Sequence, residues 1–414
     1  MHLAWKFLVR RGKKSAGLAI SIAIGIAALL LVTTLALSIE SALGKNVRDL
    51  LSSDIMLYEE NEGMIQDCNA LIHAVTQHPD VAAASPRIRI PALITYGERW
   101  ENVTAVALFG IDVVGDEKVA SVSNYVIQGN YSLFREKVVG GYVPVLVGST
   151  FAKRHGLCIY DGKLPNTTNI LKITAGKYRE VNGEFTPIVM ECVIICIFES
   201  EIPFFDASAV FIPIEAARQM LDYSPYNPKA TTILVKLKDR RDAERVLGDL
   251  LNLNSTGTAL RGETGDEVIS NFLEPAFRII RPVEYLIVGI SLTATFAKIG
   301  YSAGVSMRER KRDVGLMRAI GLSKAKIFAI YLEEHGIIGL GGGLLGAVVA
   351  CALGFILMHS NVQIYTLRFA ELTLLPSVKY VAAMVLLSFS MSLAASAYVI
   401  YKTASLSIVK AMIG

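Results

Sequence analysis

Residues 17–39 contain no charged side chain, and an apolar run of this length is typical of a helix that crosses a membrane. At about 1.5 Å per residue, such a helix spans the roughly 30 Å hydrocarbon core. Five basic residues come before it: Lys6, Arg10, Arg11, Lys13 and Lys14. The run is too long for the apolar region of a signal peptide, and no small-residue cleavage site follows it. We therefore expect an uncleaved span whose N-terminus lies in the cytoplasm, because basic flanks stay on that side.

Three further apolar segments follow at residues 283–305, 327–358 and 380–401. The composition agrees, since 19% of the residues are charged, whereas soluble domains have about 25%. The loop 307–326 is densely basic, and the loop 359–378 carries Arg368 alone of Lys and Arg. This asymmetry predicts a multi-pass protein of the cell (cytoplasmic) membrane with four spans, both termini in the cytoplasm and a large domain outside.

The long stretch between the first and second spans is hydrophilic enough to fold as a domain. Strand-like runs occur at residues 87–90, 104–109, 143–147, 190–198, 210–212 and 232–237, and amphipathic helices are expected at 64–76, 149–155, 214–221 and 239–251. Strands that alternate with helices indicate an α/β or α+β domain. Segments 40–51 and 267–280 would continue the spans as helical stalks, with kinks or breaks at Pro275 and Pro282.

The predicted fold class is therefore a membrane α-helical protein with four transmembrane helices and an extracytoplasmic α/β (α+β) domain inserted between the first two. Residues 1–44 would hold the cytoplasmic N-terminus and the first span. Residues 45–275 would form the outer domain with its stalks, and residues 276–414 would hold the other three spans.

The third apolar segment begins with polar residues and continues with a stripe of small ones. Glu333, Glu334 and His335 either lie at the cytoplasmic interface or pair inside the helix bundle, and the sequence leaves both interpretations open. Small residues then recur every three or four positions, namely Gly336, Gly339, Gly343, Gly346, Ala350 and Gly354. Such a stripe lets another helix approach closely. In the second span, Lys298 is near enough to the basic loop for snorkelling to explain it.

The sequence lacks the patterns that ATP hydrolysis, zinc binding and nucleic-acid binding require. Gly12-Lys-Lys-Ser15 lacks the upstream glycine of a P-loop and precedes a span, so we expect no ATP hydrolysis by this chain alone. The five cysteines show no zinc-ligand spacing, and Cys192 and Cys196, four apart in a strand, are expected to be buried free thiols. The net charge of +4 is spread along the chain, which argues against nucleic acid as a partner. We therefore expect no enzyme, no cofactor and no metal in this chain.

The basic loop is the most informative stretch. Residues 308–320 can form a helix with Val314, Met317 and Ile320 on one side, ended by Gly321 and followed by a second helix capped by Ser323. Such a helix on the cytoplasmic face can lie on anionic lipid or dock on a protein partner. The amphipathic pattern does not decide between the two.

Residues 307–323, Met-Arg-Glu-Arg-Lys-Arg-Asp-Val-Gly-Leu-Met-Arg-Ala-Ile-Gly-Leu-Ser, resemble a motif of the FtsX-like permease family, which includes MacB-type and LolC/LolE-type proteins. The family then has a Glu followed by a glycine-rich span, a pattern matched here by Glu334, Gly339, Gly342, Gly343 and Gly346. Phe109-Gly-Ile-Asp112, residues 146–157 with Asp161, and residues 205–213 resemble segments of its outer domain. Residues 405–412 depart from the family's usual C-terminal segment.

The resemblance implies a permease that forms a homodimer or heterodimer and recruits a separate cytoplasmic ABC ATPase, which would hold the ATP and Mg²⁺. The loop after the second span would be the ATPase-coupling helix. Its contact residues here would be Glu309, Arg310, Arg312, Asp313, Gly315, Arg318, Gly321 and Ser323. In the membrane, surrounded by lipid, five residues would serve the packing of the transmembrane helices: Glu334, Gly339, Gly342, Gly343 and Gly346.

The implied function is mechanical coupling of ATP hydrolysis to the outer domain, for export or extraction of a lipoprotein, lipid, peptide or drug-like substrate. The alternative is a non-transporting transmitter that regulates an extracytoplasmic enzyme or receptor.

Overall fold

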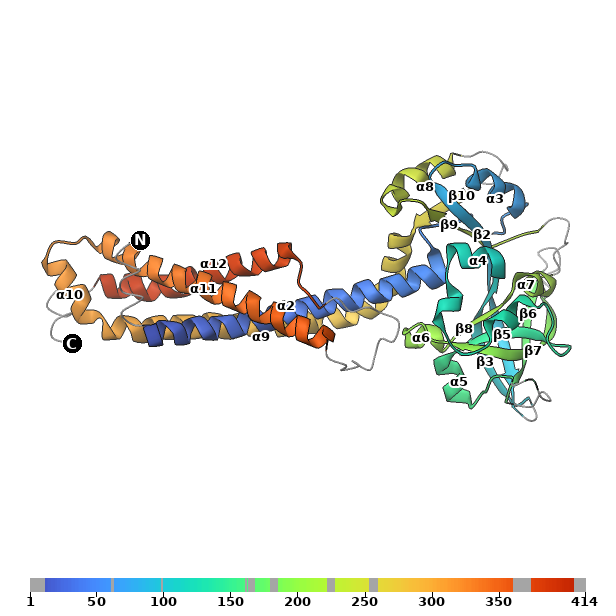
Figure 1. Cartoon of the computed structure of the whole chain (residues 1–414), viewed down its shortest axis with the longest axis horizontal. Coiled ribbons are helices and arrows are strands. Elements are labelled where there is room, and N and C mark those ends of the chain that lie inside the picture. Colours follow the sequence, from blue (N-terminus) through green and yellow to red (C-terminus); the bar gives the residue numbers. More distant parts are fainter. Residues whose placement is uncertain are drawn as a thin grey trace. The chain divides into compact units, whose positions relative to one another are not determined.

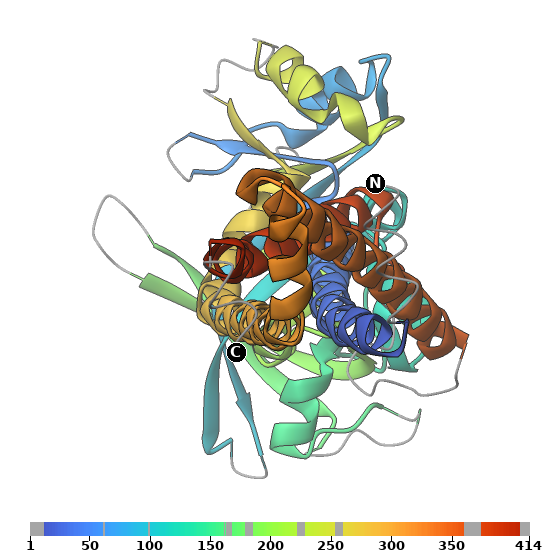
Figure 2. The same ribbon diagram turned by 90° about the vertical axis from the view of Figure 1, so that its left-hand side faces the viewer.

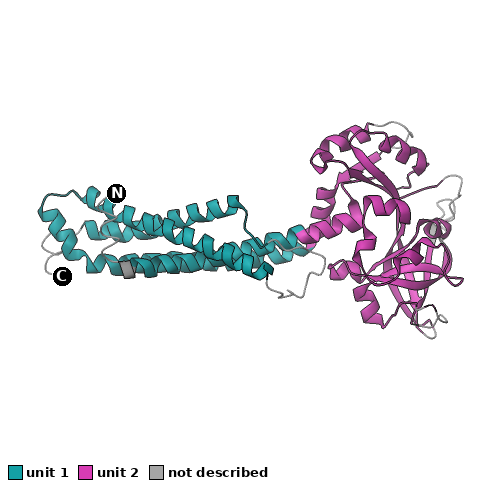
Figure 3. Cartoon of the chain, viewed as in Figure 1, with its two compact units in different colours: residues 1–41, 276–364, 371–414 teal, residues 42–275, 365–370 magenta. Residues whose placement is uncertain are grey.

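The computed structural model describes residues 12–60, 63–97, 100–160, 162, 168–178, 185–221, 228–252, 260–359 and 374–405. The chain divides into two compact units, coloured separately in Figure 3. Unit 1 comprises Met1–Ser41, Ala276–Ile364 and Glu371–Gly414, and unit 2 comprises Ala42–Pro275 with Tyr365–Ala370.

Four long helices confirm the predicted spans. They are α2 (Gly12–Val47), α9 (Gly265–Glu309), α11 (Lys324–His359) and α12 (Val378–Ala404), and each is long and apolar enough to cross a membrane. Figures 1 and 2 show them running alongside one another, with the short helix α10 (Lys311–Ala319) between α9 and α11. Of the predicted kinks or breaks in the second stalk, a break is excluded, because Pro275 and Pro282 both lie within α9.

Ten strands form one mixed sheet in the described part of unit 2. They are β1 (Ile55–Glu59), β2 (Val81–Tyr96), β3 (Asn102–Ile111), β4 (Val126–Gly129), β5 (Val143–Gly148), β6 (Ile170–Tyr178), β7 (Phe185–Phe198), β8 (Ala209–Pro213), β9 (Thr232–Leu237) and β10 (Leu260–Thr264). Their order is β10-β1-β9-β2-β3-β8-β5-β7-β4, and β6 pairs with both β2 and β7. The pairing β2-β3-β8-β5-β7-β6 therefore returns to β2 and closes on itself.

Short helices cover the sheet. They are the π-helical turn η1 (Arg48–Ser52), α3 (Cys68–Thr76), α4 (Val113–Val119), the 3-10 turns η2 (Val122–Tyr125), η3 (Tyr131–Arg135) and η4 (Arg240–Asp242), α5 (Ser149–His155), α6 (Pro203–Asp206), α7 (Ile214–Met220) and α8 (Ala243–Leu251). The four predicted helices of the outer domain all appear. Helix α3 begins at Cys68, later than predicted, because the Asp67 carboxylate accepts a hydrogen bond from the Ala70 amide and caps the first turn.

Strand β2 belongs to two apolar cores. Its first half pairs with β9, beside a core that includes Leu57, Leu71 and Val246. Its second half pairs with β3, beside a core that includes Ile194 and Phe151 and lies within the closed ring of strands. The mixed sheet and the helices that cover it confirm the predicted α/β (α+β) domain.

The predicted free thiols are found where expected. Cys192 and Cys196 are buried on β7 and form no disulfide. Burial raises the pKa of both thiols, that of Cys196 to about 12, which keeps them protonated and unreactive.

Candidate functional site

Helix α10 lies over a small apolar cluster in unit 1. Val314 and Gly315 are its buried residues. Val314 packs in a cluster with Met307, Ile327 and Tyr331, to which α12 contributes Ile400 and Ala404. One side of α10 is therefore held by the ends of three long helices.

The predicted stop and start signals around α10 are both present. Gly321 has φ +93°, a left-handed conformation that glycine adopts without steric cost, and its amide donates to the Arg318 carbonyl at 3.1 Å. The Ser323 hydroxyl then accepts a hydrogen bond from the Lys326 amide at 3.4 Å, as a residue that caps α11 would.

The other side of α10 is open. Arg312, Asp313, Leu316 and Ile320 are exposed, Leu316 by 60% and Ile320 by 71%. Residues 312, 316 and 320 recur every four positions, which places them on one side of the helix. We call these four residues the exposed face of α10. Of the other predicted contact residues, Glu309, Gly321 and Ser323 are exposed, Arg318 is half-buried and Gly315 is buried.

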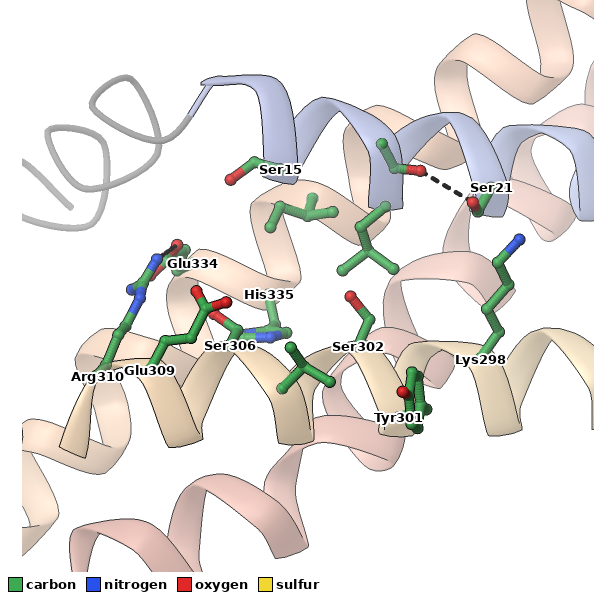
Figure 4. A pocket seen from close by; sticks show the side chains of 14 residues that line it. Ser15, Ser21, Lys298, Tyr301, Ser302, Ser306, Glu309, Arg310, Glu334 and His335 are labelled. Carbon is green, nitrogen blue, oxygen red and sulfur yellow. Dashed lines mark hydrogen bonds and ion pairs between the residues drawn. The ribbon is translucent and has the colours of Figure 1, made fainter. Parts of the chain in front are cut away.

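Arg310 lies behind α10. Its guanidinium donates two hydrogen bonds to the Glu334 carboxylate, at 2.5 and 2.7 Å (Figure 4). It also stands 5.2 Å from the centre of the Tyr331 ring. Arg310 and Glu334 are both buried, whereas Glu333 is exposed. The sequence left open whether these residues lie at the cytoplasmic interface or pair inside the bundle. For Glu334, the structure shows pairing inside the bundle. The bidentate pair ties the start of α10 to α11.

The predicted packing glycines of α11 serve two different helices. A Cβ on Gly339 would stand 2.4 Å from the Ser392 Cβ of α12, and one on Gly343 would stand 3.0 Å from the Ser388 Cβ. On Gly342 and Gly346 a Cβ would instead meet α2, where the nearest atoms belong to Ile22 and Ala23. At both contacts the neighbouring helix is too close to leave room for a side chain. The glycines therefore let α11 pack closely against α2 on one side and α12 on the other.

Two serines on α12 were missed by the sequence analysis. The Ser388 hydroxyl donates to the Gly339 carbonyl at 2.8 Å, and the Ser392 hydroxyl donates to the His335 carbonyl at 2.6 Å. Their spacing of four residues is the signal that would have found them, because hydroxyl groups in a span stabilise helix pairs at close approach.

In unit 2, the ends of the predicted stalks join the sheet through charged groups. The Arg48 guanidinium lies 2.5 Å from the Asp266 carboxylate of α9 and 3.6 Å from that of buried Asp54. Asp54 also accepts a hydrogen bond from the Leu237 amide at 3.0 Å and lies 3.3 Å from the Lys236 ammonium. These contacts link η1, β9 and the first turn of α9.

Arg87 marks the point at which β2 passes from one core to the other. Its side chain is buried, pairs with the Asp116 carboxylate and donates to the Leu50 carbonyl of η1. Desolvation raises the pKa of Asp116, and the Arg87 guanidinium opposes that shift. The turn that follows α2 is therefore joined to the middle of the sheet.

Two family models match the chain. Residues 15–253, more than half of the 414, match the MacB-like periplasmic core domain, and residues 285–408 match the FtsX-like permease C-terminal domain.

Among relatives, the lipoprotein-releasing system transmembrane protein LolE of Haemophilus influenzae is 24% identical over 367 residues, which cover 86% of this chain and 81% of LolE. An uncharacterized ABC transporter permease of Methanocaldococcus jannaschii is 29% identical over 133 residues, which cover 30% of this chain and 32% of that protein.

Two solved structures are also similar. The periplasmic region of MacB from Actinobacillus actinomycetemcomitans is 10% identical with a TM-score of 0.34, over 55% of this chain and 95% of that one. The extracellular domain of the transporter YknZ from Gram-positive bacteria is 14% identical with a TM-score of 0.33, over 51% of this chain and 99% of that one.

With both family models matched in order and four membrane-type helices in place, the chain belongs to the MacB/LolE/FtsX-like family of ABC transporter permeases.

Proposed function

We propose that the chain is the permease subunit of an ABC transporter and couples ATP hydrolysis by a separate cytoplasmic ATPase to motion of its extracytoplasmic domain. The motion would serve the export or extraction of a lipoprotein, lipid, peptide or drug-like molecule. Permeases of this family work with cytoplasmic ATPase partners, and the similarity to LolE over most of both chains favours a lipoprotein.

The exposed face of α10 is the observation that carries this proposal. Leu316 and Ile320 stand four residues apart and point away from the cluster that holds Val314. A helix that is fixed on one side and presents spaced apolar side chains beside charged ones is suited to docking in a groove of a partner protein. The partner would be the ATPase, and it would hold ATP and Mg²⁺.

Arg310 takes a different role in this proposal from its neighbours. Because its guanidinium is buried against Glu334, it positions α10, while Arg312 and Asp313 are available to a partner. A push on the exposed face of α10 would then pass through the buried pair to α11. A second permease copy, identical or different, would complete the transporter.

The test is to purify the tagged chain from its host in a mild detergent and to assay the co-purified material for ATP hydrolysis. A Leu316→Asp/Ile320→Asp variant is compared with the natural chain. The matched control is Val114→Asp/Val138→Asp, which changes two outer-unit valines that are exposed by 60% and 56%.

We expect a P-loop ATPase to co-purify with the natural chain and the control and to be lost from the α10 variant. The proposal fails if no ATPase co-purifies in several detergents. It fails equally if the α10 variant retains as much ATPase as the control, because lipid would then be the better partner for this helix.

A further inference from the structure

A cavity of about 360 Å³, with mostly apolar walls and several polar groups, lies within unit 1 between α2, α9 and α11. Its volume falls within the range of small-molecule pockets, about 300–1,000 Å³. The cavity is bounded toward α10 by Glu309 and the Arg310–Glu334 pair, and Lys298 lines it further along α9 (Figure 4). Leu18, Val305 and Ile338 supply apolar lining. The cavity therefore combines polar and apolar walls inside a membrane-type helix bundle.

One side of α9 presents donors to this cavity. Lys298, Ser302 and Ser306 recur every four residues, and Figure 4 shows all three on the side of α9 that faces α2. Two threonines of α9 instead donate within their own helix, Thr293 to the Gly289 carbonyl and Thr295 to the Ser291 carbonyl. In the part of the chain that the structure describes, Ser302 and Ser306 have no such bond. Their hydroxyls are therefore available to a ligand.

Lys298 brings a positive charge to the wall of the cavity. It has no carboxylate partner among the described residues. The Arg310 and Glu334 charges cancel each other, and Glu309 is eleven residues away along α9, about 16 Å. Lys298 is also four residues, about 6 Å, from the middle of the apolar segment 283–305. Its long side chain can carry the ammonium toward the basic loop, along the wall of the cavity, where an anion would stabilise the charge.

We propose that this cavity binds the phosphate of an anionic phospholipid. The Lys298 ammonium would supply the charge, and the Ser302 and Ser306 hydroxyls would donate to the phosphate oxygens. The acyl chains would leave along Leu18, Val305 and Ile338. A phospholipid fits better than a soluble anion because the cavity lies within the spans and its walls are partly apolar. The site does not depend on ATPase docking at α10.

Native mass spectrometry of the delipidated chain, titrated with phosphatidylglycerol or with phosphatidylcholine of the same acyl chains, tests the proposal. The variants are Lys298→Met, Ser302→Ala/Ser306→Ala and the control Lys402→Met. Lys402 is an exposed lysine near the end of α12 and does not line the cavity. Removing an unpaired charge from a span should leave the fold intact, which thermal unfolding would check.

We expect one phosphatidylglycerol to bind about tenfold more tightly than phosphatidylcholine. Lys298→Met should weaken it by about tenfold or more and the double serine variant by several-fold, while Lys402→Met has no effect.

Four results would overturn the site. Equal affinity for the two lipids, or equal effects of Lys298→Met and Lys402→Met, would mean ordinary contact with membrane lipid. Complete competition by inorganic phosphate alone would indicate a soluble anion. Lipid binding confined to monomers, with none to dimers, would mean that a second copy fills the cavity.

Discussion

Removing one partner of the Arg310–Glu334 pair leaves the other charge buried alone. We expect Arg310→Ala or Glu334→Gln to lower the free energy of unfolding by about 3–5 kcal/mol, because the remaining charge has lost its water and its partner. Arg310→Lys keeps the positive charge and should recover part of this loss. The recovery should be incomplete, because a lysine cannot make the bidentate contact. Thermal unfolding in detergent measures the difference.

The control for that prediction is two residues away. Arg312 is exposed, so Arg312→Ala should change stability by less than about 0.5 kcal/mol. If Arg310→Ala destabilises the chain no more than Arg312→Ala does, the buried pair does not hold α10.

Asp206 makes the stability of the outer unit depend on pH. Its side chain is buried at the end of α6 and accepts a hydrogen bond from the Ser200 amide at 2.9 Å. Desolvation raises the pKa of Asp206 to about 6. A raised pKa means that the folded state binds the proton more tightly, so this contribution is complete below about pH 4 and is lost as the pH rises through 6.

We therefore expect the free energy of unfolding to decrease by about 2 kcal/mol from this group as the pH rises from 4 to 7. Asp206→Asn keeps the acceptor oxygen and should flatten that part of the profile. Urea unfolding of the full chain across this range measures both. If the free energy of unfolding of Asp206→Asn depends on pH as steeply as that of the natural chain, other groups cause the pH dependence.

At the scale of elements, the glycines of α11 set how closely its neighbours approach. Gly339→Ala should destabilise the bundle by about 1–3 kcal/mol, because the new Cβ would stand 2.4 Å from the Ser392 Cβ. Gly341, where a Cβ would have no neighbour within 4 Å, is the matched control. Gly341→Ala should leave stability unchanged or raise it slightly, since alanine favours helix. Equal effects of the two variants would mean that α11 and α12 are not in close contact.

The sequence predicted the spans well because twenty or so apolar residues have few other stable conformations in a chain of this kind. It did not predict which helices the glycines would contact. Gly339 and Gly346 belong to one stripe, yet they face α12 and α2 respectively, and a spacing pattern does not identify the partner helix. Likewise, Arg310 and Glu334 are 24 residues apart, and no local pattern pairs them.

The outer domain shows the same limit. The six predicted strands all appear within β2, β3, β5, β7, β8 and β9, because their apolar runs are clear. Strands β1, β4, β6 and β10 were missed. β4 is four residues long, and β10 (Leu-Arg-Gly-Glu-Thr) is mostly polar, so its place in the sheet depends on pairing with β1. Non-local pairing of that kind is invisible to a local pattern.

At the scale of the whole molecule, the central claim is that nucleotide binding by the cytoplasmic ATPase changes the conformation of the outer unit. The chain passes between its two units within α2, at Ser41–Ala42, and within α9, at Pro275–Ala276. Beyond these points, Arg48 and Asp266 join the two segments to each other and to the sheet. Any force carried by either helix would therefore reach the same group of charged residues.

Hydrogen–deuterium exchange of the purified complex, with and without a non-hydrolysable ATP analogue, tests this most directly. We expect changed exchange in residues 42–54 and 265–275 when nucleotide binds, and no change in the Leu316→Asp/Ile320→Asp variant. Unchanged exchange throughout the outer unit, while the bound ATPase still hydrolyses ATP, would contradict it.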